Sequence, residues 1–158
     1  MIITSNSVQH EYTIPNVTIV GDVDGFENVA EKVQIYLHSS TTFDHTYETT
    51  VYDRESSSGI TTTITESKTL TEFTHYDVEL NTVGISSSSF TAFDDLEENQ
   101  VLNWTFAANT ELKNRVQNEQ EAKVLEAKDK VLNPRKYYRD SPVTPWRRRA
   151  DEASSQLS

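Results

Sequence analysis

The hydrophobic periodicity of this chain changes once along its length, near residue 93. Before that point, β-branched and aromatic residues alternate with polar ones, which is typical of strands that have one buried face. After it, apolar residues recur every three or four positions, as they do along one side of a helix. Strands that all precede the helices predict an α+β fold with an antiparallel sheet, because a parallel sheet needs helices between its strands.

Five segments have the composition and alternation of strands, and they occupy residues 11–20, 28–38, 46–53, 60–65 and 70–80. Their spacing, near ten residues, predicts an antiparallel meander or a small sandwich. Pro15 cannot donate a hydrogen bond to a neighbouring strand, so the first strand should form a sheet edge or a bulge there. The run of residues 21–25 reads as a turn, and residues 55–59 read as a polar hairpin loop.

Two helices and a basic segment follow the strands. The first helix should open at residues 93–96 with Asp94 or Asp95 as its N-cap, and pack its Trp104 side on the sheet. Asn109 should end it, and Thr110 should cap a second helix over residues 111–132. The middle of that second helix is polar nearly all round, which predicts contact with solvent or with another chain. The apolar positions of the first helix are Leu96, Val101, Trp104 and Phe106.

Charge divides the chain into three regions whose boundaries match these changes in pattern. The expected β-rich domain, residues 1–92, has 13 acidic and 3 basic residues, and the helical segment 93–132 has 9 and 5. Residues 133–158 instead carry 3 acidic and 6 basic residues and show no periodicity, which predicts an extended, basic C-terminal arm. Its aromatic and arginine side chains are the candidate partner-binding residues, with a tail folded back on its own domain as the alternative. They are Tyr137, Tyr138, Trp146, Arg147, Arg148 and Arg149.

The composition argues against several chemistries. The chain contains no cysteine, which excludes disulfides and thiolate metal sites, and its net charge of −11 opposes general binding to phosphates. His38 and His45 flank a Ser/Thr segment, and residues 22–25 resemble the start of a calcium loop, but neither has a full ligand set. We find no nucleophile elbow and no phosphate-binding loop. The sequence therefore predicts no enzyme, with no catalytic, cofactor-binding or metal-binding residues, and no membrane span.

Short motifs in the second half of the chain carry a resemblance to a known family. They are Phe93-x-x-Leu96, Gln100-Val101-Leu102-x-Trp104, a Lys/Glu/Gln-rich helix, Pro134 and Pro145-Trp146, preceded by the turn Val23-Asp24-Gly25. Over residues 16–146 this order resembles a family of small uncharacterised proteins of tailed bacteriophages, often marine ones, with a β-rich N-terminal part. The chain departs from the family pattern in its longer approach, residues 139–146, and in continuing past Trp146 to Ser158. The resemblance implies a phage origin and no known catalytic residues.

Together, these observations predict a non-enzymatic structural or accessory protein of a phage particle, in its tail, neck or capsid surface. Its expected location is the virion, and its expected partners are other phage structural proteins and copies of itself. No cofactor is expected, and nucleic acid would be contacted only through the basic C-terminal arm. The alternative is a phage protein of the host cytoplasm that binds a host protein through an acidic surface.

Overall fold

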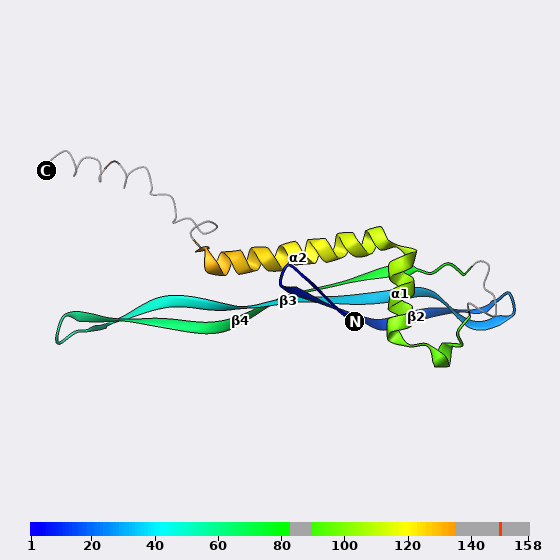
Figure 1. The fold of residues 1–158 in the computed structure, drawn as a ribbon, viewed down its shortest axis with the longest axis horizontal. Helices are drawn as coiled ribbons and strands as arrows, with labels where there is room; N and C mark the ends of the chain where they lie inside the picture. The colour runs from blue at the N-terminus through cyan, green and yellow to red at the C-terminus, as the bar shows by residue number, and fades with distance from the viewer. Residues whose placement is uncertain (83–89, 135–148, 150–158) are drawn as a thin grey trace.

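The strands form one antiparallel sheet, and the helices pack on one of its faces (Figure 1). The computed structural model describes residues 1–82, 90–134 and 149. The sheet has the order β1-β2-β3-β4, so that each strand pairs with the next one along the chain. This four-stranded meander followed by helices confirms the predicted α+β class, with four strands where about five were expected. The elements are β1 (Ile2–Ser5), β2 (Val8–Val23), β3 (Phe26–Asp53), β4 (Ser58–Glu79), the 3-10 helix η1 (Phe93–Asp95), α1 (Glu98–Ala108) and α2 (Thr110–Leu132).

The strand count differs because two pairs of expected strands are continuous in the structure. β3 joins the segments 28–38 and 46–53 into one strand of 28 residues, and β4 joins 60–65 and 70–80 into one of 22 residues. The Ser/Thr-rich residues between the expected strands stay in the ladder, since threonine is a good strand former. The short strand β1 was not expected, and it pairs with the first residues of β2.

Local sequence signals set the first hairpin and the irregularity in β2. The ladder between β2 and β3 shifts register between Thr13 and Asn16, which confirms a bulge at Pro15. Asp24 and Gly25 connect these two strands, and both have positive φ, 54° and 85°. Asp-Gly is a favoured pair for a two-residue hairpin turn because both positions need the left-handed region.

The hydrophobic core lies between the sheet and the two helices. Alternate residues of β3 point toward the helices and are buried, among them Val33, Ile35 and Leu37. Figure 1 shows α2 running along the sheet and α1 crossing the strands near one end of α2. The buried cluster joins both halves of the chain, and its members are Tyr12, Val33, Ile35, Leu37, Val78, Val101 and Leu102.

The start of the first helix is not where the sequence placed it. Asp94 and Asp95 lie in η1, and α1 begins after Glu97, whose side chain makes no capping hydrogen bond. Leu96 separates the two helices because its backbone is extended and its side chain packs partly against the core. The prediction that an aspartate caps the helix is therefore wrong. Trp104 does pack against the core as predicted.

The second helix has the predicted length, but its cap lies one residue earlier. Asn109 is the N-cap, and its side-chain oxygen accepts a hydrogen bond from the Leu112 backbone N–H at 3.1 Å. Thr110 is already helical, and its hydroxyl donates to the Phe106 carbonyl at 2.8 Å. The prediction of Thr110 as the cap is thus corrected to Asn109. The helix ends at Leu132, two residues before Pro134, as expected.

The core predicts a large effect of truncating its leucine in α1. Leu102 is fully buried, so Leu102→Ala should lower the free energy of unfolding by about 2–5 kcal/mol, measured by urea denaturation. The matched control is Leu132→Ala, because Leu132 lies at the end of α2 and is exposed. We expect the control to change stability by less than about 0.5 kcal/mol. Equal effects of the two substitutions would contradict the position of the core.

Candidate functional site

One side of the polar middle of α2 faces the sheet. Gln117, Gln120 and Glu121 are buried against the strands. The prediction that this part of the helix contacts solvent or another chain is therefore wrong for these three residues, while Asn118, Glu119 and Lys123 are exposed. Its physical reason is that β2 and β3 present polar side chains of their own beneath the helix, so the buried polar groups can satisfy one another.

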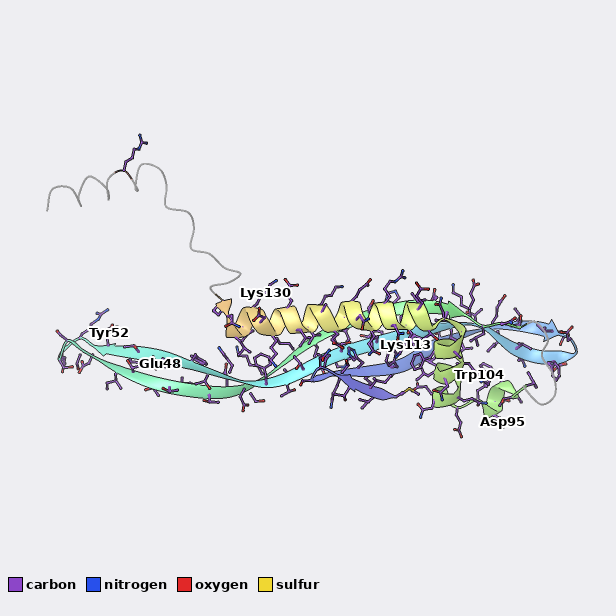
Figure 2. All side chains as sticks on the ribbon, turned by 45° about the horizontal axis from the view of Figure 1, so that its top comes forward. Glu48, Tyr52, Asp95, Trp104, Lys113 and Lys130 are labelled. Carbon is purple, nitrogen blue, oxygen red and sulfur yellow. The ribbon has the colours of Figure 1, made fainter. Side chains whose placement is uncertain are left out.

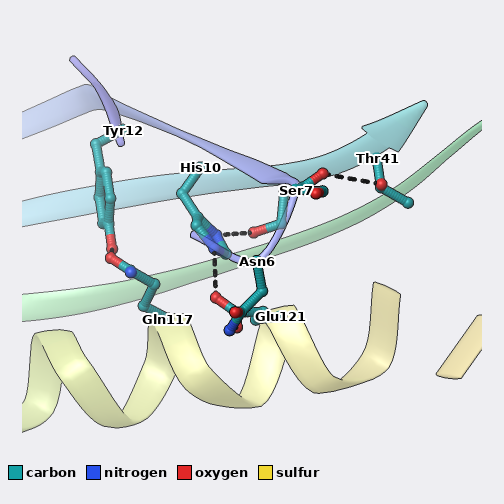
Figure 3. Close-up of polar contacts among 8 residues, drawn as sticks. Asn6, Ser7, His10, Tyr12, Thr41, Gln117 and Glu121 are labelled. Carbon is teal, nitrogen blue, oxygen red and sulfur yellow. Dashed lines mark hydrogen bonds and ion pairs between the residues drawn. The ribbon is translucent and has the colours of Figure 1, made fainter. Parts of the chain in front are cut away.

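His10 is the centre of this buried polar cluster, which we define as Asn6, His10, Ser39 and Glu121 (Figure 3). His10 is 0% exposed, and its Nε2 lies 3.2 Å from Glu121 Oε2. A carboxylate can only accept, so this nitrogen carries the hydrogen. The Nδ1 atom lies 2.8 Å from Ser39 Oγ, and the serine hydroxyl donates to it when the ring is neutral.

Glu121 is held in its ionised form by its neighbours. Burial on its own would raise the pKa of this carboxyl. Hydrogen bonds from Asn6, His10 and Ser5, with the charge of His10, outweigh burial, so the pKa of Glu121 is lowered from its usual value. Asn6 belongs to the β1–β2 turn and has a positive φ of 48°, so Glu121 links α2 to that turn. The cluster thus connects α2 with β2, with β3 and with the β1–β2 turn.

A second polar contact lies one helical turn away. The Tyr12 hydroxyl donates to Gln117 Oε1 at 2.7 Å, and the tyrosine ring is fully buried. Burial, and then the nearby Tyr76, raises the pKa of Tyr12 above its usual value. Burial also raises the pKa of Tyr76 to about 12. Both phenols therefore stay protonated at neutral pH, which leaves Tyr12 able to donate to the helix.

The polar cluster contains the residue types of a hydrolase triad, but its geometry favours a structural role. Ser39 is 0% exposed beneath α2, so no substrate can reach its hydroxyl while the helix is in place. A cavity of about 210 Å³ lies elsewhere, between β2 and the η1–α1 segment. It is smaller than the roughly 300 Å³ of typical ligand sites. Its lining is Ile14, Val17, Phe93, Leu96, Glu97, Glu98 and Val101.

A second exposed feature is a projecting hairpin, which we call the arm and define as residues 44–67. The Lys128 ammonium of α2 lies 5.4 Å from the centre of the Phe43 ring, near the end of the helix. Beyond Phe43 the paired strands β3 and β4 continue past the helix (Figure 1). Figure 2 shows Glu48 and Tyr52 on this part of the hairpin, away from both helices.

The two faces of the arm differ in chemistry. One face has cross-strand threonine pairs, with hydroxyl distances of 2.9 Å for Thr46–Thr65 and 3.0 Å for Thr50–Thr61. The opposite face continues the core-facing register of β3 and pairs Tyr47 with Ile64 and Val51 with Ile60. Val51 and Ile60 are 68% and 67% exposed. An apolar stripe of this kind on a projecting element is typical of an interaction surface.

The tip of the arm is an ordered turn. The Asp53 carboxylate accepts hydrogen bonds from the Glu55 N–H at 3.0 Å and the Ser56 hydroxyl at 2.9 Å. These hydrogen bonds lower the pKa of Asp53, and the bond from the Glu55 backbone has the largest effect. Tyr52 is 76% exposed and lies across from Gly59, where an added Cβ would be 3.1 Å from the tyrosine ring. The glycine therefore leaves room for an aromatic side chain that is otherwise open to solvent.

Most of the predicted partner-binding residues lie outside the described part of the chain. Tyr137, Tyr138, Trp146, Arg147 and Arg148 belong to that group. Of the predicted set, only Arg149 is described, and it is exposed.

The histidines considered as metal ligands lie on opposite faces of β3 and do not come together. His38 stacks on Phe73 with ring centroids 4.5 Å apart, and His45 stacks on Tyr47 at 5.2 Å. Within the described residues, no three acidic or histidine side chains are arranged to hold a metal ion. Of residues 22–25, Asp22 and Val23 end β2, and Asp24 and Gly25 form the β2–β3 turn. Among the described helices, none has the length and apolarity needed to cross a membrane.

Comparison with known proteins identifies the family of the chain. A family model described as a domain of unknown function (DUF7936) matches residues 7–146. The chain therefore belongs to this family, and the matched region contains the whole sheet after β1, both helices and the residues up to Trp146. A search of curated proteins and a search of solved structures found no match.

Sequence reasoning did not find the polar cluster or the arm. His10, Ser39 and Glu121 are far apart in the chain, and no local pattern relates them. The arm had a readable signal: apolar residues recur at even spacings, at Phe43, Tyr47 and Val51 and again at Ile60, Ile64 and Leu70, with polar residues between them. Its projection from the sheet depends on where α2 ends, which periodicity does not reveal.

The lowered pKa of Glu121 predicts a contribution to stability that depends on pH. A depressed folded-state pKa stabilises the protein above the unfolded value, and this stability is lost as pH falls through the folded pKa. Glu121→Gln should therefore lower the free energy of unfolding at pH 7 by about 1–3 kcal/mol. As the pH is lowered below about 5, its free energy of unfolding should also fall less than that of the wild type. Chemical denaturation at a series of pH values would measure both.

The matched control is Glu119→Gln, which replaces an exposed carboxylate on the same helix. We expect its effect at pH 7 to stay within about 0.5 kcal/mol. If Glu121→Gln and Glu119→Gln behave alike at every pH, the polar cluster does not fix α2 on the sheet.

Proposed function

We propose that this protein is a non-enzymatic structural or accessory subunit of a bacteriophage particle, and that it acts through contacts between subunits. The observation that carries this proposal is the arm, which extends two paired strands beyond the part of the sheet that α2 covers. An element of this shape gains little stability within a monomer, because an isolated two-stranded ribbon has almost no core. Contact with a neighbouring subunit would cover it.

The chemistry of the arm supports protein as the partner. Its apolar stripe offers Tyr47, Val51, Ile60 and Ile64 on one face, with hydroxyl groups on the other. Aromatic and aliphatic side chains surrounded by polar ones are the usual composition of protein interfaces. Acidic residues such as Glu48 and Glu66 on the same arm oppose contact with phosphates.

The resemblance of the sequence to tailed-phage proteins supports the phage origin and hence the particle as the setting. Repeated copies on a symmetric particle strengthen weak contacts, because each bound copy raises the effective concentration of the next. In this proposal the basic C-terminal segment, residues 133–158, supplies a second contact, through Tyr137, Tyr138, Trp146 and the run Arg147 to Arg149. The tail, the neck and the capsid surface all fit these contacts.

The test is quantitative mass spectrometry of purified particles of the phage that encodes the chain. We expect the protein in many copies per particle. Replacing Val51 and Ile60 with threonine should reduce the copy number at least about tenfold while leaving stability within about 0.5 kcal/mol, because both side chains are exposed in the monomer. The matched control changes Thr46 and Thr65 on the hydroxyl face to serine.

Two results would contradict the proposal. One is a particle that lacks the protein although the infected cell contains it. The other is full incorporation of the Val51/Ile60 variant, which would leave the arm without a role in assembly.

A further inference from the structure

The outer edge of β4 is unpaired over the whole strand within the described residues. β4 is the last strand of the sheet and spans Ser58–Glu79, and its only strand partner in the described residues is β3. The ladder with β3 runs from Lys32 to Asp53 without a register shift, so the edge is regular throughout. A long regular edge presents a row of backbone donors and acceptors that another strand can bind.

The two edges of the sheet differ in how they are protected. On the other side of the sheet, β2 carries Pro15 and two register shifts, and β1 covers its first residues. Bulges, prolines and short covering strands are the devices that prevent strands from pairing edge to edge. β4 has no proline and no bulge, and Lys68 is its single lysine. The β1–β2 edge is thus interrupted by these devices, whereas the β4 edge is regular along its whole length; past Ser40, β3 likewise pairs only with β4 in the described residues.

We propose that the β4 edge binds the β4 edge of a second copy of this chain, antiparallel, around a two-fold axis at Ser67. The argument is the self-complementarity of the strand about this residue. With Ser67 opposite itself, Glu66 lies opposite Lys68 of the second copy, and Lys68 lies opposite its Glu66. A two-fold axis makes every such contact occur twice.

The flanking pairs in this register are also compatible. Ile64 lies opposite Leu70 of the second copy, and Thr65 lies opposite its Thr69. Ile64, Glu66, Lys68 and Leu70 share the face that α2 covers further along the sheet. Opposite charges and aliphatic pairs directly across two antiparallel strands each stabilise the pairing, whereas like charges destabilise it. A shift of the axis by one residue would place Lys68 opposite itself.

The same register brings each arm beside the body of the other copy. Residues 55–66 of one chain then run alongside residues 68–79 of the second copy, the part of β4 over which α2 lies. A helix with its side chains is roughly 10 Å wide, and strands are about 4.8 Å apart, so one helix reaches across about two strands. Because α2 already lies over strands of its own sheet, Ile60 and Ile64 come to lie on the strand next to those that the helix of the second copy covers. The dimer thus flanks the β4 half of the apolar stripe, while Tyr47 and Val51 lie one strand farther from the second copy.

This inference rests on the proposed function in that it names a second copy as one partner of the arm. A dimer can nevertheless form whether or not the protein enters a particle, so the two are tested separately. Because the chain lacks cysteine, a single introduced thiol reports one position without background.

The first experiment is oxidative cross-linking of Ser67→Cys, read on a non-reducing gel. Residues directly opposite one another have Cβ atoms about 4.5–5.5 Å apart, close to the separation of a disulfide. We expect a covalent dimer in high yield. The matched control is Thr63→Cys, an exposed residue on the same strand face, whose two copies would be about 26 Å apart at 3.3 Å per residue.

Mixing tests the register directly. In this register Thr63 lies opposite Thr71 of the second copy. A mixture of the Thr63→Cys protein with the Thr71→Cys protein should therefore cross-link, and neither protein should do so alone. A Ser67→Cys yield no higher than that of Thr63→Cys overturns the proposed axis. The mass of the wild-type protein is measured by light scattering at about 100 μM. A mass equal to that of one chain overturns the dimer itself.

The second experiment reverses charges. Lys68→Glu places four carboxylates around the axis, and we expect a folded monomer with an unchanged circular dichroism spectrum. The exchange Glu66→Lys with Lys68→Glu restores opposite charges and should restore the dimer. It also preserves the contact of 3.4 Å between these two residues within one chain. A Lys68→Glu protein that stays dimeric overturns the proposal.

The outcomes also separate this inference from the proposed function. A dimer that cross-links at residue 67 but is absent from particles keeps the inference and removes the particle role. Incorporation into particles by a protein that is monomeric in solution and does not cross-link at residue 67 keeps the particle role and removes the inference.

Discussion

The unbroken pairing of β3 with β4 is the constraint on which the rest of the structure depends. Side chains alternate between the faces of a strand, so one register assigns every residue of both strands to a face. The alternation that places Val33, Ile35 and Leu37 under the helices also places Tyr47 and Val51 on the same face beyond them. Core and arm are thus two parts of one stripe. A shift by one residue would expose the core and bury the threonine pairs.

The second determinant is the position of α2, and polar contacts contribute to it as much as apolar ones. The helix is polar on average, yet its buried face meets Asn6, His10 and Tyr12 through hydrogen bonds of defined geometry. Hydrogen bonds of this kind are specific because a buried group that loses its partner costs about 1–3 kcal/mol. A helix that slid by one turn would separate Glu121 from His10. The polar cluster therefore fixes the position of α2 along the sheet, and with it the point at which the uncovered arm begins.

An open edge and an apolar arm follow from these two constraints. Because α2 stops near Phe43, the hairpin beyond it has no cover on its apolar face within the described chain. Because the meander ends with β4, the longest uninterrupted ladder of the sheet also forms its edge. Both features would be costly in a protein that acts alone, and both are suited to association with further chains. The proposed dimer uses them together, since pairing at Ser67 places the β4 half of each arm beside the part of β4 that α2 covers in the other copy.

The sequence by itself determined the fold class, the turn at Asp24 and Gly25, the bulge at Pro15 and the extent of the second helix, because these depend on local period and backbone preference. It did not determine that Ser39 and Thr41 continue a strand on its buried face, because the partners of their hydroxyl groups, His10 and the Ser7 carbonyl, are distant in the chain. The burial of Glu121 was decided only by the tertiary structure, because its partners His10 and Asn6 are more than a hundred residues away. The arm likewise depends on the end of one element relative to another, a relation that no local pattern contains.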